Sequence, residues 1–300
     1  GNYNTAFGDS ALRLNTTASN NTAVGYQAAY SNTTSSYVTA VGHRAAFSHT
    51  AGGLAAFGYE ALNSNTTGGN NSAFGRYRPL YSNTTGSYNT AVGNQALMNN
   101  TTGSNNAALG DGALQTNTTA SYNTAVGHQA GYSNTTGAGN TALGYIASTA
   151  NTTGAYNTMV GSNTFINNTT GNSNTGIGHA ILYNSTTASN NTALGYYALF
   201  SNTTASDNTA VGYQAGYSNT TGSLNVAVGQ GALYSNTTAS DNTAVGRNAL
   251  YANTTGAGNS AFAGALSNNT TGGFNPGMGY QALRQNTTAS NNTAVGYQAG

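Results

Sequence analysis

The chain has 300 residues, and its composition departs from that of an ordinary globular domain. Only 4% of the residues are charged, Lys is absent and the formal net charge is +1, whereas soluble domains usually carry about 25% charged residues. This balance argues against nucleic acid or an anionic membrane as a partner. No stretch stays apolar for the roughly 18 residues that a membrane span needs. The absence of Cys excludes disulfides, thiolate metal sites and thiol catalysis.

An apolar residue followed by Gly recurs every 17 residues along the whole chain. The repeat from Gly42 to Gly58 is one residue short, and the repeat from Gly75 to Gly93 is one residue long. Ala263 replaces the Gly after Phe262, and the repeat that follows is also one residue short. The apolar anchors are Phe7, Val24, Val41, Phe57, Phe74, Val92, Leu109, Val126, Leu143, Val160, Ile177, Leu194, Val211, Val228, Val245, Phe262, Met278 and Val295. We therefore predict a single repeat array over residues 1–300, as a segment of a longer fibre.

A repeat of this length is too short for a helix pair or a propeller blade, which need about 34 to 50 residues. The segments around the anchors are short, rich in Thr and Val, and separated by Gly and by Asn-Thr-Thr-Gly, as in residues 208–222. This pattern is typical of short strands joined by tight turns. One unit cannot bury a face alone and becomes stable only by stacking on its neighbours. The sequence predicts an all-β fold, a β-solenoid (β-roll or β-helix) of about eighteen 17-residue coils.

Positions within the repeat predict environments. The large apolar anchors are expected to face the core, with Val24, Val41, Val126, Val211 and Val228 in one buried column. The Ala before each anchor is expected at a close approach to another backbone, and the Gly after it at a corner with positive φ. An Asn stands four residues before the Gly in every repeat but two. These Asn side chains are expected to form a hydrogen-bonded ladder from coil to coil.

Three further features complete the expected coil. Ala-Leu pairs are expected to form a second core-facing strand: Ala11-Leu12, Ala96-Leu97, Ala113-Leu114, Ala232-Leu233, Ala249-Leu250 and Ala282-Leu283. One slot before the Asn-Thr-Thr turn is expected to stack its rings: Tyr30, Tyr81, Tyr132, Tyr183, Tyr217, Tyr234 and Tyr251. Because Pro79 cannot donate a ladder hydrogen bond, we expect a bulge or corner loop at Arg76 to Pro79, with Leu80 resuming the Leu column.

Residues that could carry catalysis are sparse. Among the carboxylates only Asp207 and Asp241 share a slot, two coils apart, and nothing accompanies them. His43, His128 and His179 all follow an anchor Gly but lie too many coils apart to share a metal, so they are expected at exposed corners. We predict no catalytic, cofactor-binding or metal site.

The motif Asn-x-Thr occurs once per coil at one turn, and it is the acceptor pattern for N-glycosylation. The candidate asparagines are Asn15, Asn32, Asn65, Asn83, Asn100, Asn117, Asn134, Asn151, Asn168, Asn184, Asn202, Asn219, Asn236, Asn253, Asn269 and Asn286. Asn-Thr-Thr-Gly is equally good turn chemistry, and the paired Thr hydroxyls could carry O-linked sugar. One coil has His49 in place of the acceptor. We expect that coil to lack sugar and to be the least stable.

The step Asn-Asn-Thr-Ala-Val-Gly, as in Asn20–Gly25 and Asn291–Gly296, resembles the head repeats of trimeric autotransporter adhesins. The resemblance implies a left-handed parallel β-roll that forms trimers. The fuller repeat, with Gly-Tyr-Gln-Ala-Leu and Ser-Asn-Thr-Thr-Gly, is also similar to repeats of bacteriophage tail fibres and environmental surface fibres. The adhesin repeat is shorter and lacks the Asn-Thr-Thr insertion.

The predicted function is that of a non-enzymatic extracellular structural fibre, a glycosylated β-solenoid rod of a surface appendage or filament. Self-association as a trimer or filament bundle and covalent glycans are the expected partners, and the cell or virion surface is the expected location. The alternatives are an adhesin or phage tail-fibre shaft that binds cell-surface glycans with its Tyr rows, and an ice-binding protein with bare Thr ladders.

Overall fold

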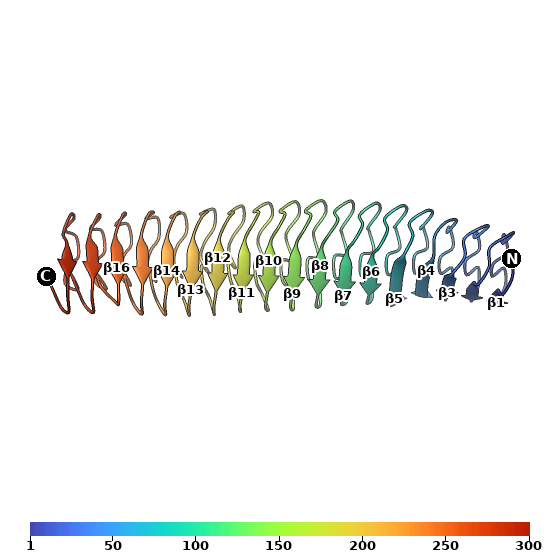
Figure 1. Ribbon diagram of the computed structural model, residues 1–300, viewed down its shortest axis with the longest axis horizontal. Helices are drawn as coiled ribbons and strands as arrows, with labels where there is room; N and C mark the ends of the chain where they lie inside the picture. Colours follow the sequence, from blue (N-terminus) through green and yellow to red (C-terminus); the bar gives the residue numbers. More distant parts are fainter. The chain divides into compact units, whose positions relative to one another are not determined.

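The computed structural model describes residues 1–300 and contains short strands and turns but no helix; thus no helix in it could cross a membrane. It divides into two compact units, Gly1–Gly154 and Ala155–Gly300. Each unit is a parallel β-solenoid with one strand per turn, so the predicted fold class is confirmed (Figure 1). The single array over residues 1–300 stays a prediction.

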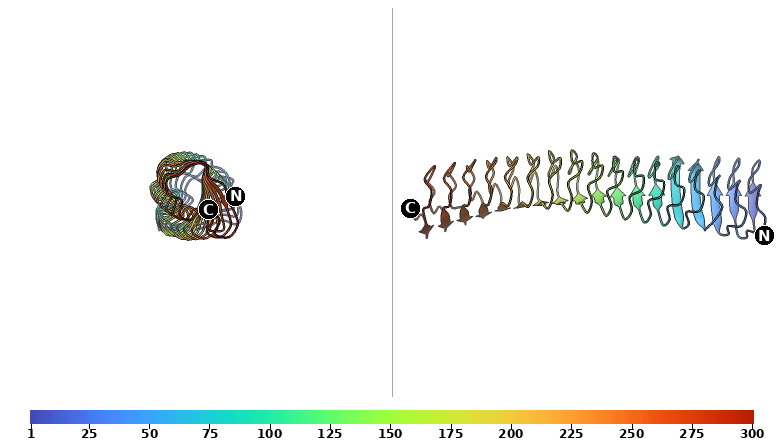
Figure 2. Two further views of the ribbon diagram at one scale, coloured as in Figure 1. Left: turned by 90° about the vertical axis from the view of Figure 1, so that its left-hand side faces the viewer. Right: turned by 90° about the horizontal axis from the view of Figure 1, so that it is seen from above.

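Within each unit the strands follow one another along one side of the coil (Figure 2). The first unit contains β1 (Thr5–Phe7), β2 (Thr22–Val24), β3 (Val38–Val41), β4 (Leu54–Tyr59), β5 (Asn71–Tyr77), β6 (Thr90–Val92), β7 (Ala107–Leu109), β8 (Thr124–Val126) and β9 (Thr141–Leu143). The second contains β10 (Thr158–Val160), β11 (Thr175–Ile177), β12 (Thr192–Leu194), β13 (Thr209–Val211), β14 (Val226–Val228), β15 (Thr243–Val245), β16 (Ser260–Phe262), β17 (Pro276–Met278) and β18 (Ala294–Val295). Equivalent residues of neighbouring coils pair in register, as Ala91 does with Ala108.

The strands alternate between the interior and the surface, but in the opposite sense to the prediction. In β6 the middle residue, Ala91, is fully buried, while Thr90 and Val92 face outward. The anchors do form one column in each unit, as the pairing of Val24 with Val41 shows. Their expected burial is wrong: Val24 is only half-buried, and Leu109 is 43% exposed. The Ala column forms the core face of the strands.

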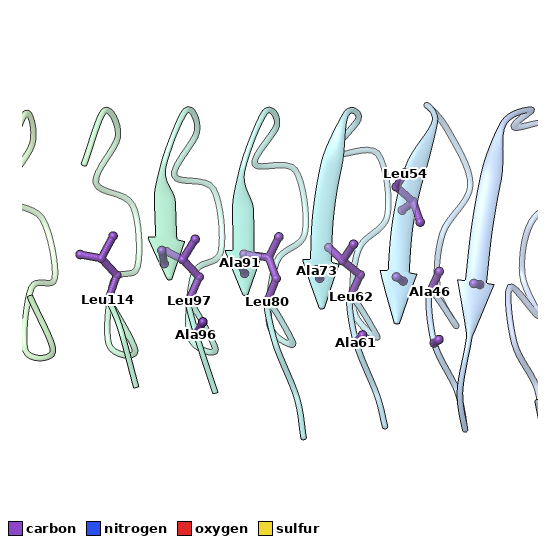
Figure 3. Close-up of a cluster of buried hydrophobic side chains, with 14 of the residues drawn as sticks. Ala46, Leu54, Ala61, Leu62, Ala73, Leu80, Ala91, Ala96, Leu97 and Leu114 are labelled. Atoms are coloured by element: carbon purple, nitrogen blue, oxygen red, sulfur yellow. The ribbon is translucent and has the colours of Figure 1, made fainter. Parts of the chain in front are cut away.

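Most strands place Ala at the interior position, because leucines from the opposite wall fill the space. The larger exception is Met159, which is buried at this position beside Gly176 of the next coil. Leu62, Leu80 and Leu97 reach toward the strand alanines, among them Ala73 and Ala91 (Figure 3). The tightness is clearest where Gly176 takes the Ala slot. A Cβ there would lie 2.8 Å from Sδ of Met159 and 3.1 Å from Cγ2 of Ile181. A large anchor therefore has no room inside and turns outward.

The Ala-Leu pairs lie in the core but not in a second strand. Leu97 and Leu114 have φ of 51° and 50°, which is the left-handed region and incompatible with a β-strand. The backbone N–H of Leu97 still donates to the carbonyl of Ala113 in the next coil, at 3.0 Å. A sharp turn thus brings Leu into the interior, so the predicted burial is confirmed and the predicted strand is wrong.

The Gly after each anchor lies at a corner where a side chain has no space. At Gly195, φ is 125°, and a Cβ would lie 2.6 Å from the carbonyl oxygen of Gly212 in the next coil. The expectation of positive φ is confirmed there.

The long repeat carries its extra residue as a bulge. Phe57 pairs with Phe74, but Tyr59 pairs with Tyr77, so the register shifts by one residue across Gly75 and Arg76. Leu80 is fully buried in the Leu column, and the carbonyl of Pro79 accepts from the N–H of Leu62. The predicted bulge and the return of the Leu column are confirmed.

Candidate functional site

The asparagines of the Asn-Thr-Thr turn face the interior and form runs of side-chain hydrogen bonds from coil to coil within each unit, here called the turn ladder. The Nδ2 of Asn117 donates to Oδ1 of Asn100 at 2.7 Å and to the carbonyl of Ala120 at 3.0 Å. Its own Oδ1 accepts from Asn134 at 2.9 Å. Asn117 is therefore bonded to the coils on both sides and to its own turn.

The asparagines four residues before the corner Gly form a second run, the strand ladder. The Oδ1 of Asn89 accepts the backbone N–H of Asn106 at 3.0 Å. The Nδ2 of Asn106 donates to the carbonyl of Ala120 at 2.9 Å, the same oxygen that Asn117 contacts. The predicted Asn ladder is confirmed, and that shared carbonyl joins it to the turn ladder.

The turn asparagines are not on the surface, contrary to the expectation behind their glycosylation. Their Nδ2 atoms, to which a sugar would be attached, are buried and donate hydrogen bonds. The buried ones are Asn32, Asn65, Asn83, Asn100, Asn117, Asn134, Asn151, Asn168, Asn202, Asn219, Asn236, Asn253 and Asn269. Asn15 and Asn286 lie in the same turn and are half-buried. A sugar on a buried amide would break both bonds of its rung.

Asn184 is different, because it does not occupy the turn-ladder position. Ser185 does: it lies 17 residues after Asn168, and its N–H donates to Leu182 as that of Asn202 does to Leu199. The buried Ser185 hydroxyl has no hydrogen-bond partner. Asn184 stands one position earlier and is half-buried. Counting 17 residues from Asn168 would have revealed this exchange in the sequence.

Another set of Asn-x-Thr/Ser motifs does place its first Asn on the surface. Asn20, Asn70, Asn190 and Asn291 are exposed, and each begins Asn-Asn-Thr or Asn-Asn-Ser. All four have φ between 56° and 63°, in a left-handed turn just before the strand. The second Asn of each motif belongs to the strand ladder. A search of the sequence for Asn-Thr-Thr turns misses these acceptors, because they lie outside that turn.

His49 takes the place of Asn in the turn ladder. Its Nε2 lies 2.5 Å from the carbonyl of Gly52, which can only accept, so Nε2 carries the proton. Its Nδ1 then accepts from Nδ2 of Asn65 at 3.0 Å. Burial lowers the pKa of His49, while the hydrogen bond with Gly52 acts in the opposite sense. The neutral ring thus supplies the donor and the acceptor that an Asn rung supplies.

The aromatic slot before the turn stacks its rings from coil to coil, as predicted for the second unit. The longest run is Tyr183, Phe200, Tyr217, Tyr234 and Tyr251, with centroids 4.9–5.3 Å apart and interplanar angles of 4–21°. Stacked rings cover one another's faces, and CH–π contact with a sugar needs a free face. Tyr234 also has a raised pKa because of burial and then of its neighbours Tyr251 and Tyr217. The run offers mainly ring edges to a ligand.

The predicted corner histidines lie after their anchor Gly and continue such stacks; His43 and His128 are exposed as predicted, whereas His179 is half-buried. His43 stacks between Tyr26 and Tyr59 at 5.2 and 5.0 Å, and His179 stacks on Tyr196 at 5.2 Å. His128 is exposed and stacks on Tyr145. Each histidine therefore serves as one ring of a surface stack.

The carboxylates do not assemble into a site. Asp207 and Asp241 are exposed in the same left-handed slot, and Oδ1 of Asp207 accepts from Asn190 at 3.0 Å. Glu60 is buried and forms the one salt bridge of the structure, 2.7 Å from Nε of Arg78. No group of three or more His, Asp or Glu side chains could hold a metal ion.

No protein-family model and no curated protein sequence matches the chain. The function is therefore argued from the two ladders and from the surface of the coils.

Proposed function

We propose that the chain is a non-enzymatic structural segment of an extracellular surface fibre, which associates with copies of itself through its outward anchors. The observation that carries this proposal is the column of anchors on the outer face of the strands, here called the outer column. None of its members is buried, and Phe74, Leu109, Leu143, Ile177 and Met278 are 38–50% exposed.

The surroundings of the outer column favour a second copy as its occupant. Soluble sheets prevent association by placing charges on exposed faces and edges. Here the second outward residue of most strands is Thr, as in β8 and β9, and only 4% of the chain is charged. Nothing in the outer face of those strands repels another copy. The resemblance to adhesin head repeats and fibre repeats points to a trimer at a cell or virion surface.

The interior supports a passive mechanical role. Most rungs of both ladders are bonded to their neighbours along the coil axis, as at Asn117 and Asn106, and these bonds use neutral side chains alone. Their strength needs no metal, disulfide or bound ligand. A repeat whose hydrogen bonds run along the coil axis suits an extended structural element.

Sedimentation equilibrium of the chain tests self-association. We expect wild type to be oligomeric and the double variant Leu109→Asp/Leu143→Asp to dissociate at least tenfold more readily, because two charges would be buried in the contact. Tyr122→Asp is the matched control, since Tyr122 is 70% exposed outside the outer column. A wild-type chain that stays monomeric at every concentration would contradict the proposal.

Ice binding is the second candidate, and one observation favours it. The second Thr of the turn is exposed in nearly every coil, as at Thr102, Thr119 and Thr136. These threonines form a regularly spaced column on the surface. Such a column could order water. Thermal hysteresis of the folded chain, lost in a variant with these three residues changed to Lys, would favour this function over the structural one.

Glycan decoration of the fibre is proposed at other positions than the turn ladder. The exposed acceptors are Asn20, Asn70, Asn167, Asn190, Asn268 and Asn291, while the buried amides are engaged in the ladder. Glycopeptide mass spectrometry of native material is expected to find sugar at exposed acceptors and none at Asn117. Sugar at Asn117 in folded material would contradict the ladder as described.

A further inference from the structure

A hollow of about 400 Å³ opens on the surface of the second unit, within the range of about 300–1,000 Å³ that holds small ligands. It lies at the coil of residues 263–278, here called the notch coil. The residues that matter around it are Arg247, Asn248, Gly264, Tyr280, Gln281 and Arg284. None of them belongs to the ladders or to the outer column.

The hollow arises from one missing corner residue. Three residues separate Val245 from Ala249, but only two separate Phe262 from Ala265. The flanking positions are equivalent, because Phe262 pairs with Val245 and the N–H of Leu250 donates to Ala265. Arg247 and Tyr280 follow the corner Gly of the coils before and after the notch coil. Between them the notch coil has only Ala263 and Gly264 and therefore no long side chain.

The empty space is as tall as one missing side chain in the row of residues that follow the corner Gly. Arg247 and Tyr280 stand two coils apart, or about 10 Å at the strand spacing. Elsewhere in the second unit this row is filled, and Tyr196 and Tyr213 stack at 5.7 Å. A six-membered ring could occupy the empty level, with the guanidinium of Arg247 on one side and the ring of Tyr280 on the other.

The charge of the hollow selects an anion. Arg247 and Arg284 are exposed, and the only salt bridge of the structure is that of Arg78 and Glu60. No carboxylate lines the hollow. Two guanidinium groups on one concave surface, with no acid to neutralise them, favour a carboxylate ligand that each can bind through paired N–H donors.

We propose that the hollow of the notch coil binds an acidic sugar residue, a pyranose that bears a carboxylate such as a hexuronate. The carboxylate pairs with Arg247 and Arg284, the side-chain amides of Asn248 and Gln281 bond ring hydroxyls, and the C–H face of the sugar lies on Tyr280. One face of Tyr280 stacks on Tyr297 at 5.8 Å, and no ring stacks on the other face. This binding site goes beyond the structural role and does not depend on it.

Isothermal titration calorimetry of the full chain at low ionic strength tests the site, with galacturonic acid trimer as the probe. We expect binding that weakens at least tenfold in Arg247→Gln and in Arg284→Gln, because each variant loses a charged contact. Arg13→Gln is the matched control, an exposed Arg of the first unit, and should bind as wild type does. A Tyr inserted between Ala263 and Gly264 restores the missing rung and should abolish binding.

A variant whose thermal unfolding midpoint equals that of wild type is folded, so its loss of binding reports on the site. Absence of binding by wild type, equal affinity for a neutral galactose trimer, or equal loss in Arg13→Gln would overturn the proposal. Inorganic sulfate that binds as tightly as the trimer would do so too, since it would mark a simple anion site with no sugar recognition.

Discussion

Two coils of this protein are one residue short, and they accommodate the deletion in different places. In the His49 coil, residues 43–58, the deleted position is the left-handed residue before the strand, so that Gly53 leads directly into Leu54. In the notch coil the deletion is at the corner after the anchor, between Phe262 and Ala265. The first deletion accompanies a changed interior. The second leaves the interior intact and opens the surface.

In the His49 coil and in the strand before it, other side chains replace the Asn of both ladders. Val38 and Leu54, both buried, occupy strand-ladder positions, and His49 occupies the turn ladder. The notch coil keeps both ladders: Asn275 donates its N–H to Asn259 at 3.0 Å, and Asn269 donates to Asn253 at 2.9 Å. Where Asn is replaced in this region, the interior is refilled by apolar side chains or by a neutral His, whereas the corner after the anchor can lose a residue without any change to the interior.

The largest expected effect is the loss of a ladder rung in the notch coil. Asn269 donates to Asn253 and to the carbonyl of Gly272, and accepts from Asn286. Asn269→Leu removes three hydrogen bonds and should lower the free energy of unfolding by about 3 kcal/mol, at about 1 kcal/mol each. Urea unfolding followed by circular dichroism measures the change.

The neighbouring Asn268 provides the control for that rung. Asn268 is exposed, so Asn268→Leu should change stability by less than about 0.5 kcal/mol. If both substitutions lowered the free energy of unfolding equally, the turn ladder would not be what stabilises the notch coil.

The second prediction concerns the pH dependence of the His49 coil. Burial lowers the pKa of His49 below its ordinary value of 6.5, and a proton on Nδ1 would face the Nδ2 donor of Asn65. Above pH 6.5 both the folded and the unfolded chain hold a neutral His49, and its contribution is fully present. Below pH 6.5 the unfolded chain binds a proton that the folded chain does not. The free energy of unfolding therefore decreases as the pH is lowered.

Hydrogen exchange of backbone amides at pH 5 and pH 8, corrected for intrinsic rates, should show this loss in residues 46–62. The variant His49→Asn should remove the pH dependence, since Asn restores the rung without a titrating group. The exposed His128 in His128→Asn is the control and should leave the pH dependence unchanged. Equal pH dependence in wild type and His49→Asn would contradict the role assigned to His49.

The sequence predicted the period, the register and one Asn ladder, because residues that stack must recur at the same position of each coil. It failed on which side chains face inward. Large apolar anchors such as Leu109 were expected inside, yet the space opposite the strand is filled by leucines such as Leu97, so most strands place Ala there. The residues of the turn likewise predict that the chain turns there. They do not predict that the side chain of Asn117 points into the core. The width of the interior decides both, and it depends on side chains from the opposite wall.

The smallest expected effects concern the glycines that close the two deletions. Gly52 of the His49 coil has φ of 88°, and a Cβ there would lie 2.8 Å from Cα of Gly69 in the next coil. Gly264 of the notch coil has φ of 77°, and a Cβ would lie 3.1 Å from the carbonyl oxygen of Arg247. Both alanine variants pay for a left-handed conformation, but the backbone contact at Gly52 is closer. We expect Gly52→Ala to cost about 2 kcal/mol and Gly264→Ala about 1 kcal/mol.

Urea unfolding midpoints of the two alanine variants compare the deletions directly. A tightly closed turn must shift its neighbouring coil to admit a methyl group, and Gly52 adjoins the turn ladder through His49. Hydrogen exchange should therefore rise around residues 49–53 and 66–69 in Gly52→Ala. In Gly264→Ala the change should stay at the corner and leave the amides of Asn269 and Asn275 protected, because the ladders there do not depend on that corner. If Gly264→Ala exposed those ladder amides as well, the corner after the anchor would be part of the structural frame, and the notch would no longer be a place where the coil is free to vary.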